Sequence, residues 1–109
     1  MRVLLMSAVA VLLASSTAVA ADVAKGKELY DGRCSFCHGS DGKGDGPAGA
    51  ALQPRPTDFT AASFWKVANA EMIRFTITNG KPGTAMIPFG QTLKPGEIDD
   101  LTAYLQTLK

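Results

Sequence analysis

Two cysteines and the only histidine of the chain lie within five consecutive residues, Cys34-Ser35-Phe36-Cys37-His38. A C-x-x-C-H run is the attachment sequence of a covalently bound c-type haem. In that chemistry each thiol forms a thioether with one vinyl group of the porphyrin, and the adjacent imidazole becomes an axial ligand of the iron. The pattern therefore predicts one haem c per chain, attached through Cys34 and Cys37, with His38 as an iron ligand.

Three other interpretations of these residues are weaker. A thioredoxin-like dithiol is expected after a strand in a βαβ unit, and the sequence shows no such pattern. A closed structural zinc site usually has four nitrogen or sulfur ligands, whereas the chain offers three, Cys34, Cys37 and His38. A simple disulfide would leave the adjacent histidine without a role. We therefore favour haem attachment.

The N-terminus has the layout of a secretory signal peptide. A charged start at Met1-Arg2 is followed by an apolar run from Val3 to Leu13 and then by Ala18-Val19-Ala20. We predict cleavage of residues 1–20 and export to the periplasm. An uncleaved membrane anchor is the alternative, but the apolar run is shorter than the roughly 20 residues needed to span a bilayer.

Residues 21–109 then form a single small domain with balanced charge. The full chain has 11 Lys and Arg against 10 Asp and Glu. The predicted signal peptide contains one of these charged residues, Arg2, so its removal leaves 10 of each sign. Without a basic excess the domain is not expected to bind nucleic acid. A chain of this size buries a modest fraction of its surface, so we expect a bound haem to supply much of the core.

The apolar pattern of residues 21–109 indicates helices joined by glycine-rich loops, without the alternation typical of strands. We predict a first helix that begins after Asp22 as N-cap and ends near residue 33 or 34. The last helix is expected over residues 95–108, with one apolar stripe. A glycine inside a helix lowers its stability and often marks a close contact, so we expect Tyr104 to lie over Gly26 where the two helices cross.

Two shorter helices are expected between the terminal ones. The first covers residues 61–67 with Thr60 as its cap. The second covers residues 70–78, with Asn69 as its cap and Gly80 as the glycine that ends it.

The second axial ligand of the iron follows partly from composition. A second histidine is absent from the sequence, and of four methionines Met1 and Met6 leave with the signal peptide. Met72 falls where the helical pattern expects a core residue, and methionine at such spacing usually packs in the core. Met86 lies in the Gly- and Pro-framed loop over residues 80–89, so we favour Met86. An open sixth position remains the alternative.

The sequence resembles the class I single-haem cytochromes c of bacteria. The likeness is carried by Gly26 and Tyr30 before the C-x-x-C-H run, by Asn79-Gly80-Lys81-Pro82-Gly83-Thr84-Ala85-Met86, and by Leu101-Thr102-Ala103-Tyr104-Leu105. It implies an all-α fold in which about four helices and long loops wrap around one haem. It also implies that Met86 binds the iron opposite His38.

The resemblance further implies a contact behind the haem histidine. In this family a proline carbonyl commonly accepts the other ring N–H of that histidine and so fixes its orientation. Pro54 is our candidate for this haem-site residue, with Pro47 and Pro56 as rivals. The sequence departs from the family in one respect, because Ile87 separates Met86 from the next proline.

Three side chains are candidates for contact with the haem propionates, namely Arg55, Trp65 and Lys81. We favour Arg55, because a guanidinium can bind a carboxylate through two hydrogen bonds. The alternative is that all three are ordinary surface residues.

Protein ligands on both faces of the iron leave no coordination site for a substrate. The sequence thus predicts a monomeric periplasmic carrier of single electrons, not an enzyme, that docks transiently on donor and acceptor redox proteins. A gas sensor or peroxidase-like protein with an open or labile sixth site is the alternative, and a fixed subunit of a larger oxidoreductase is a third possibility. The balanced charge gives no indication of which proteins are the partners.

Overall fold

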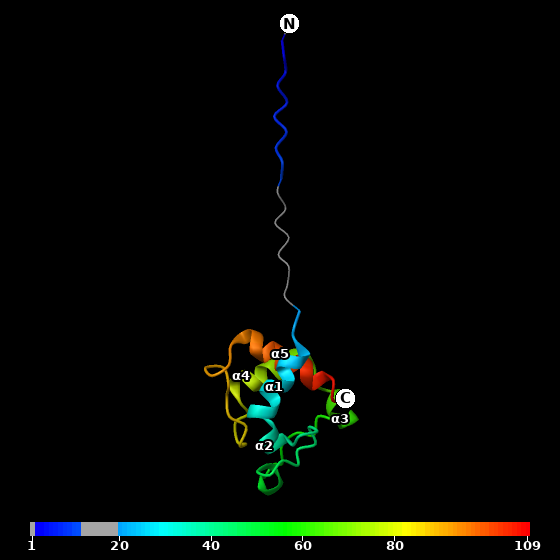
Figure 1. Ribbon diagram of the computed structural model, residues 1–109, viewed down its shortest axis with the longest axis vertical. Coiled ribbons are helices and arrows are strands. Elements are labelled where there is room, and N and C mark those ends of the chain that lie inside the picture. Colours follow the sequence, from blue (N-terminus) through cyan, green and yellow to red (C-terminus); the bar gives the residue numbers. More distant parts are fainter. Residues whose placement is uncertain (1, 12–19) are drawn as a thin grey trace.

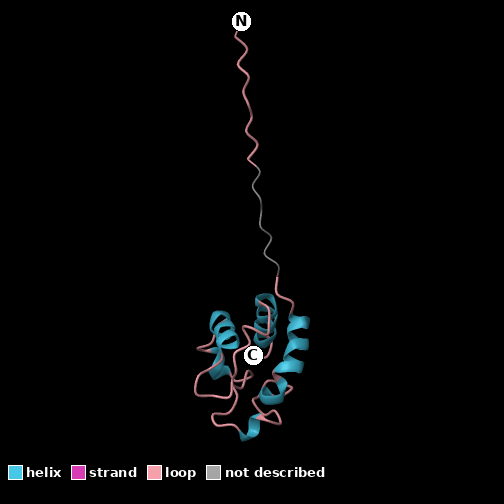
Figure 2. Cartoon of the chain, turned by 90° about the vertical axis from the view of Figure 1, so that its left-hand side faces the viewer, coloured by secondary structure: helices cyan, strands magenta, loops and turns pink. Residues whose placement is uncertain are grey.

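The computed structural model describes residues 2–11 and 20–109. In this part of the chain all regular structure is helical, which confirms the predicted all-α class (Figure 2). Long loops join the helices (Figure 1). The elements are α1 (Val23–Arg33), α2 (Ser35–His38), the short 3-10 helix η1 (Gly49–Ala51), α3 (Ala62–Trp65), α4 (Ala70–Asn79) and α5 (Pro95–Gln106).

The segment before the helical body has no helix or strand over residues 2–11, and its large apolar side chains are exposed. The rest of the predicted signal peptide, apart from Ala20, lies outside the described residues, so its cleavage stays a prediction. Over the ranges that are described, no helix has both the length and the apolar character needed to cross a membrane.

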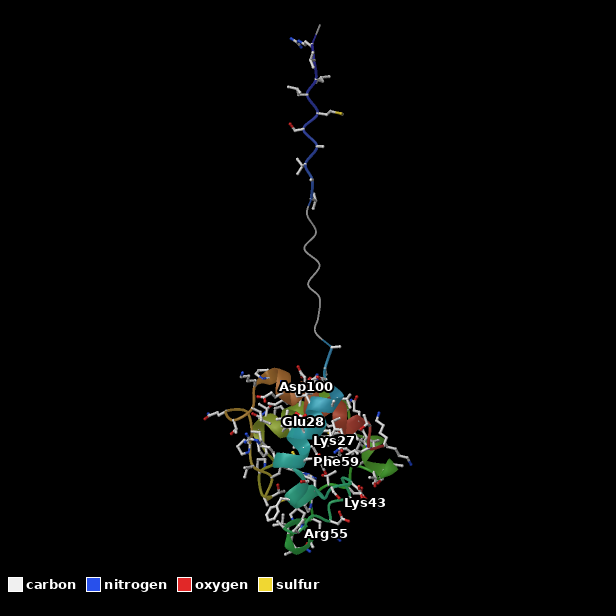
Figure 3. The ribbon with its side chains drawn as sticks, viewed as in Figure 1. Lys27, Glu28, Lys43, Arg55, Phe59 and Asp100 are labelled. Atoms are coloured by element: carbon white, nitrogen blue, oxygen red, sulfur yellow. The ribbon has the colours of Figure 1, made fainter. Side chains whose placement is uncertain are left out.

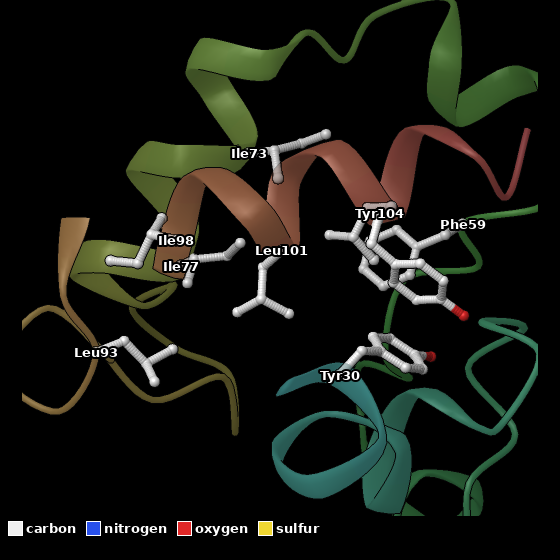
Figure 4. Packing of buried hydrophobic residues seen from close by; sticks show 9 residues of the cluster. Tyr30, Phe59, Ile73, Ile77, Leu93, Ile98, Leu101 and Tyr104 are labelled. Carbon is white, nitrogen blue, oxygen red and sulfur yellow. The ribbon is translucent and has the colours of Figure 1, made fainter. Parts of the chain in front are cut away.

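Helices α1 and α5 cross at Gly26, as expected from the sequence. A Cβ atom at this position would collide with the carbonyl oxygen of Asp100 and would lie 2.9 Å from the Cβ of Tyr104. One turn further along α1, the ring of Tyr30 packs against that of Tyr104 with centroids 5.2 Å apart (Figure 4). The missing side chain at Gly26 therefore lets the two backbones approach closely enough for the tyrosines to pack.

The hydrophobic core lies between α1, α4 and α5, and it also takes in residues from the loops (Figure 4). Apolar side chains of α4 and α5 face each other within it. Its buried members are Tyr30, Phe59, Ile73, Ile77, Leu93, Ile98, Leu101, Tyr104 and Leu105. This small cluster holds the frame of terminal helices from which the C-x-x-C-H segment extends.

The predicted N-caps of helices α1 and α4 are confirmed. The Asp22 carboxylate accepts a hydrogen bond of 3.1 Å from the N–H of Lys25 at the start of α1. The Asn69 side chain accepts one of 2.8 Å from the N–H of Met72 at the start of α4. Helix α4 ends at Asn79, and Gly80 follows it as the C-cap with a positive φ of 71°, which glycine adopts without steric cost.

The predicted cap of α3 is wrong. Helix α3 begins one residue later, after Ala61, and is shorter than the 61–67 span expected. The N–H and the hydroxyl of Thr60 instead donate to the same oxygen of Asp58, at 2.8 and 2.7 Å. Thr60 therefore belongs to a local turn with Asp58 and lies one residue before the N-cap position, which Ala61 occupies.

Candidate haem site

The C-x-x-C-H segment continues directly from α1 as the single turn of α2. The carbonyl of Cys34 accepts hydrogen bonds from the N–H groups of Cys37, at 3.2 Å, and of His38, at 2.9 Å. Both thiols are free and half-buried. Burial raises the pKa of the Cys34 thiol to about 11, because a thiolate would lose its solvation. The segment thus holds two free thiols about one helical turn apart, as attachment to the two vinyl groups of a porphyrin requires.

A backbone carbonyl determines which ring nitrogen of His38 carries the proton. Its Nδ1 lies 3.2 Å from the carbonyl oxygen of Thr57. A carbonyl only accepts, so Nδ1 carries the proton and Nε2 is left with its lone pair for a metal. Burial lowers the pKa of His38, which favours the same neutral form.

The carbonyl behind His38 is therefore that of Thr57, and the prediction of Pro54 for this contact is wrong. The reason lies in how the segment after the prolines is held. The N–H of Phe59 donates to the carbonyl of Gly42 at 2.7 Å, and a Cβ at Gly44 would collide with the carbonyl of Pro56. These contacts hold the backbone around Thr57 against the glycine-rich turn that follows His38, whereas Pro54 precedes this stretch and is exposed.

Phe59 is a site residue that the sequence analysis missed. Its ring stacks on the His38 imidazole with centroids 4.7 Å apart and an angle of 25° between the planes. The ring is buried, with 8% of its surface exposed. A single aromatic in a loop carries no spacing signal, so only the folded path of residues 39–59 reveals this contact.

Met86 lies half-buried in the loop that follows α4. Its N–H bonds to the Thr84 hydroxyl at 3.2 Å, and its carbonyl accepts from the N–H of Lys81 at 3.1 Å. The far end of the loop is held on α4, since the Phe89 N–H donates to the carbonyl of Ile77 at 2.9 Å. The loop therefore has a defined backbone on both sides of Met86, as needed to direct a thioether.

Met72 is not the core residue expected from the helical pattern. It is 40% exposed, and the buried face of α4 consists of Ile73 and Ile77. The prediction placed Met72 on the wrong face, because methionine and isoleucine adjacent in sequence fit the same apolar stripe. The preference for Met86 therefore rests on the shape of its loop and on the family resemblance.

The three candidates for propionate contact have different surroundings. The indole N–H of Trp65 donates to the carbonyl of Phe59 at 2.7 Å. Because this is the one donor of the side chain, the structure does not support a hydrogen bond from Trp65 to a propionate. Arg55 is exposed in the loop after η1, at the end of the helical body away from Asp100 (Figure 3). Lys81 is exposed at the start of the Met86 loop. The role of Arg55 stays a prediction.

The geometry does not favour a thioredoxin-like dithiol or a structural zinc site over haem attachment. The C-x-x-C pair follows a helix, α1, whereas a thioredoxin-like dithiol follows a strand. Over residues 2–11 and 20–109 no group of three or more His, Cys, Asp and Glu side chains is arranged to hold a metal ion. The donor set instead consists of two thiols and one neutral imidazole with a free Nε2, which fits a haem attached by two thioethers.

Comparison with known proteins decides between these interpretations. Residues 23–109 match the family model described as cytochrome c. The chain belongs to the cytochrome c family. Cytochrome c-554(547) of Halothiobacillus neapolitanus is 34% identical over 92 residues, which cover 83% of this chain and all of that protein. Cytochrome c6 of Nostoc sp. is 34% identical over 91 residues, covering 84% of this chain and 75% of the relative.

One further relative is much longer than this chain. Subunit FixP of a Cbb3-type cytochrome c oxidase from Azorhizobium caulinodans is 34% identical over 84 residues, and this chain spans only 26% of it.

Among solved structures, the KustC0563 c-type cytochrome has a TM-score of 0.64 at 30% identity, and the match covers 77% of this chain and 96% of that one. A chain of a Kuenenia stuttgartiensis HAO-like complex has a TM-score of 0.69 at 28% identity, over 80% of this chain and 42% of that one.

The family confirms the fold, the cofactor and the general activity expected from the sequence. The chain is a class I monohaem cytochrome c with the cytochrome c fold and one covalently bound haem c. Its activity is electron transfer by a c-type cytochrome. The bound haem supplies one-electron chemistry by cycling between ferric and ferrous iron.

Proposed function

We propose that this cytochrome c is a periplasmic carrier of single electrons in which His38 and Met86 bind the iron from opposite faces and Cys34 and Cys37 hold the haem. The observation that carries the proposal is the 3.2 Å contact between Nδ1 of His38 and the carbonyl of Thr57. It commits the proton to Nδ1 and presents Nε2 as the ligand atom, as in other metal-binding histidines.

The assignment of Met86 as the second ligand is supported by its loop. Gly80, whose φ is positive, starts the loop, and a Cβ there would lie 2.8 Å from the carbonyl oxygen of Met86. The loop is thereby folded back on itself around that residue. Methionine opposite histidine is a known haem ligand pair and raises the reduction potential.

Two protein ligands define what the domain does and does not do. They keep substrate off the iron, so His38 and Met86 support electron transfer and not catalysis. They also change little in geometry between the two redox states. A small protein of this type exchanges electrons through brief contacts with donor and acceptor proteins, and such contacts bury little surface. We infer a monomer that docks on each partner in turn.

Cleavage of the predicted signal peptide is supported by the exposure of the N-terminal residues that the structure describes. The apolar side chains of residues 3–11 are exposed, with Met6 at 97% and Leu4 at 91%. Removal of this segment therefore takes no packing from the core. N-terminal sequencing of the protein recovered from a periplasmic extract tests cleavage: Ala21 is the expected first residue, and a chain that retains Met1 contradicts it.

A fixed subunit of a larger oxidoreductase is the second candidate. The similarity to the oxidase subunit FixP favours it, although the chain spans only 26% of that protein. Size-exclusion chromatography of the native protein from its own cells separates the two proposals. Elution at the mass of one 11.4 kDa chain or less supports the free carrier, and elution with other chains supports the subunit.

The ligand set is tested by carbon monoxide, which binds ferrous haem only where the sixth position is open or labile. The wild-type ferrous protein is expected to form no carbonyl complex rapidly at neutral pH, and Met72→Ala should behave in the same way. Met86→Ala should bind carbon monoxide readily. Rapid, complete binding by the wild type would support the gas-sensor or peroxidase-like alternative and refute the carrier.

A further inference from the structure

One short segment contacts two sides of the His38 imidazole. Thr57 bonds to the Nδ1 edge of the ring, and Phe59, two residues later, covers a face of it with centroids 4.7 Å apart. The hydrogen bond explains which nitrogen carries the proton. The stacked ring is not needed for that purpose and calls for a role of its own.

The ring of Phe59 is held more firmly than a loop side chain usually is. Its N–H donates to the carbonyl of Gly42 at 2.7 Å, and its carbonyl accepts from the indole N–H of Trp65 at 2.7 Å. The ring of Phe64 meets it edge-on, with centroids 5.6 Å apart and planes at 70°. The backbone on both sides and a second aromatic ring therefore fix Phe59 independently of His38.

The two contacts constrain the imidazole in different ways. A hydrogen bond to a carbonyl tolerates a broad range of directions around the oxygen, so Thr57 determines the protonated nitrogen more strictly than the tilt of the ring. Stacked aromatic rings instead favour a nearly parallel, offset arrangement, and the observed 25° lies close to it. The plane of the imidazole is thus governed mainly by Phe59.

We propose that Phe59 is a positioning residue that sets the rotation of the His38 imidazole about its bond to the iron. This inference rests on the proposed ligation by His38. The orientation of an axial imidazole determines how the unpaired electron of low-spin ferric haem spreads over the porphyrin, and it thereby tunes the site from outside the ligand shell. Phe59 acts through His38 and has no direct part in electron transfer.

The test compares Phe59→Leu with Phe64→Leu in the haem-loaded ferric protein by proton NMR. Both variants replace a ring in the same aromatic cluster, but only Phe59 stacks on the imidazole. Phe59→Leu should change the order and spread of the four haem methyl shifts. Phe64→Leu keeps the two backbone hydrogen bonds that hold Phe59, so it should leave the order of the shifts unchanged. An unchanged pattern in Phe59→Leu, or equal changes in both variants, would overturn the proposal.

A second measurement needs no variant and applies even where Phe59→Leu fails to fold. In the ferrous wild-type protein, the Phe59 ring protons should show nuclear Overhauser effects to the ring protons of His38. Their absence would overturn the stacking in the haem-loaded state. Failure of the ligation itself has a different signature, because a ferric protein without the His38 ligand shows no shifted imidazole resonances at all.

Discussion

Replacement of Gly26 by alanine tests how the fold brings its terminal helices together. An alanine Cβ would collide with the carbonyl of Asp100 and would lie 2.9 Å from the Cβ of Tyr104. Two of the neighbouring atoms belong to the backbone of α5, so the collision cannot be relieved by a change of rotamer. Helix α5 as a whole has to move away from α1.

The expected loss of stability follows from two opposing effects. Overpacking in a close contact costs about 1–3 kcal/mol, and the rigid neighbours place this site at the upper end of that range. Alanine in place of glycine in a helix gains about 1 kcal/mol. The free energy of unfolding of Gly26→Ala should therefore fall by about 2 kcal/mol.

Denaturant unfolding of the haem-loaded protein, followed by far-ultraviolet circular dichroism, measures this change. Gly32→Ala is the matched control, because it makes the same substitution in α1 at a position where nothing from the rest of the fold lies within 4 Å of the new Cβ. That variant should gain about 0.4–1 kcal/mol. A Gly26→Ala protein as stable as the wild type, or as stable as Gly32→Ala, would refute the account of the helix crossing.

Three further predictions concern single hydrogen bonds and charges. Tyr30→Phe removes a buried hydroxyl that donates to the carbonyl of Gly39 at 2.5 Å. The buried carbonyl is then left without a donor, which should reduce the free energy of unfolding by about 1–3 kcal/mol. Hydrogen bonds from Thr60 hold the pKa of Asp58 below its ordinary 3.8, so an NMR titration of Thr60→Val should show that pKa raised. Because the folded pKa is depressed, the stabilisation is present above about pH 3.8 and is lost as the pH falls through the folded pKa. Arg55→Gln should lower the reduction potential in a redox titration, because loss of a positive charge near a propionate favours ferric haem.

Each of these predictions has an outcome that contradicts it. Unchanged unfolding of Tyr30→Phe would show that its hydroxyl adds nothing to the fold. An Asp58 pKa that is the same with and without the Thr60 hydroxyl would refute the cause assigned to its shift. For Arg55, the charge-preserving Arg55→Lys is the control, and an equal fall in potential for both variants would exclude the charge as the cause.

The parts of the structure that follow from local sequence were predictable. The C-x-x-C-H run identifies the haem attachment by itself, and the caps at Asp22 and Asn69 act within one turn of their own helices. The close crossing at Gly26 was also predictable, because a glycine in one helix and an aromatic residue in another have few ways to pack. In each case the signal and the contact lie on regular elements.

The errors fall where the outcome depends on the path of a loop or on the rotation of a helix. Thr57, not Pro54, bonds to His38, because the glycine turn after His38 and the Gly42–Phe59 hydrogen bond together decide which carbonyl arrives there. Met72 lies on the exposed side of α4, since its neighbour Ile73 occupies the core. Neither result is encoded in residue spacing, and both require the three-dimensional packing.

The ligand pair on the iron is tested most directly by proton NMR of the ferrous protein with its methionine methyl groups labelled with carbon-13. Residues 21–109, the domain expected after cleavage, contain two methionines, Met72 and Met86. When the sulfur of a methionine binds the iron, the methyl group on that sulfur lies over the porphyrin, whose ring current shifts the methyl resonance strongly upfield. The account predicts one such resonance, retained in Met72→Ala and lost in Met86→Ala. Two methyl resonances at ordinary positions, or a shifted one that survives Met86→Ala, would contradict it.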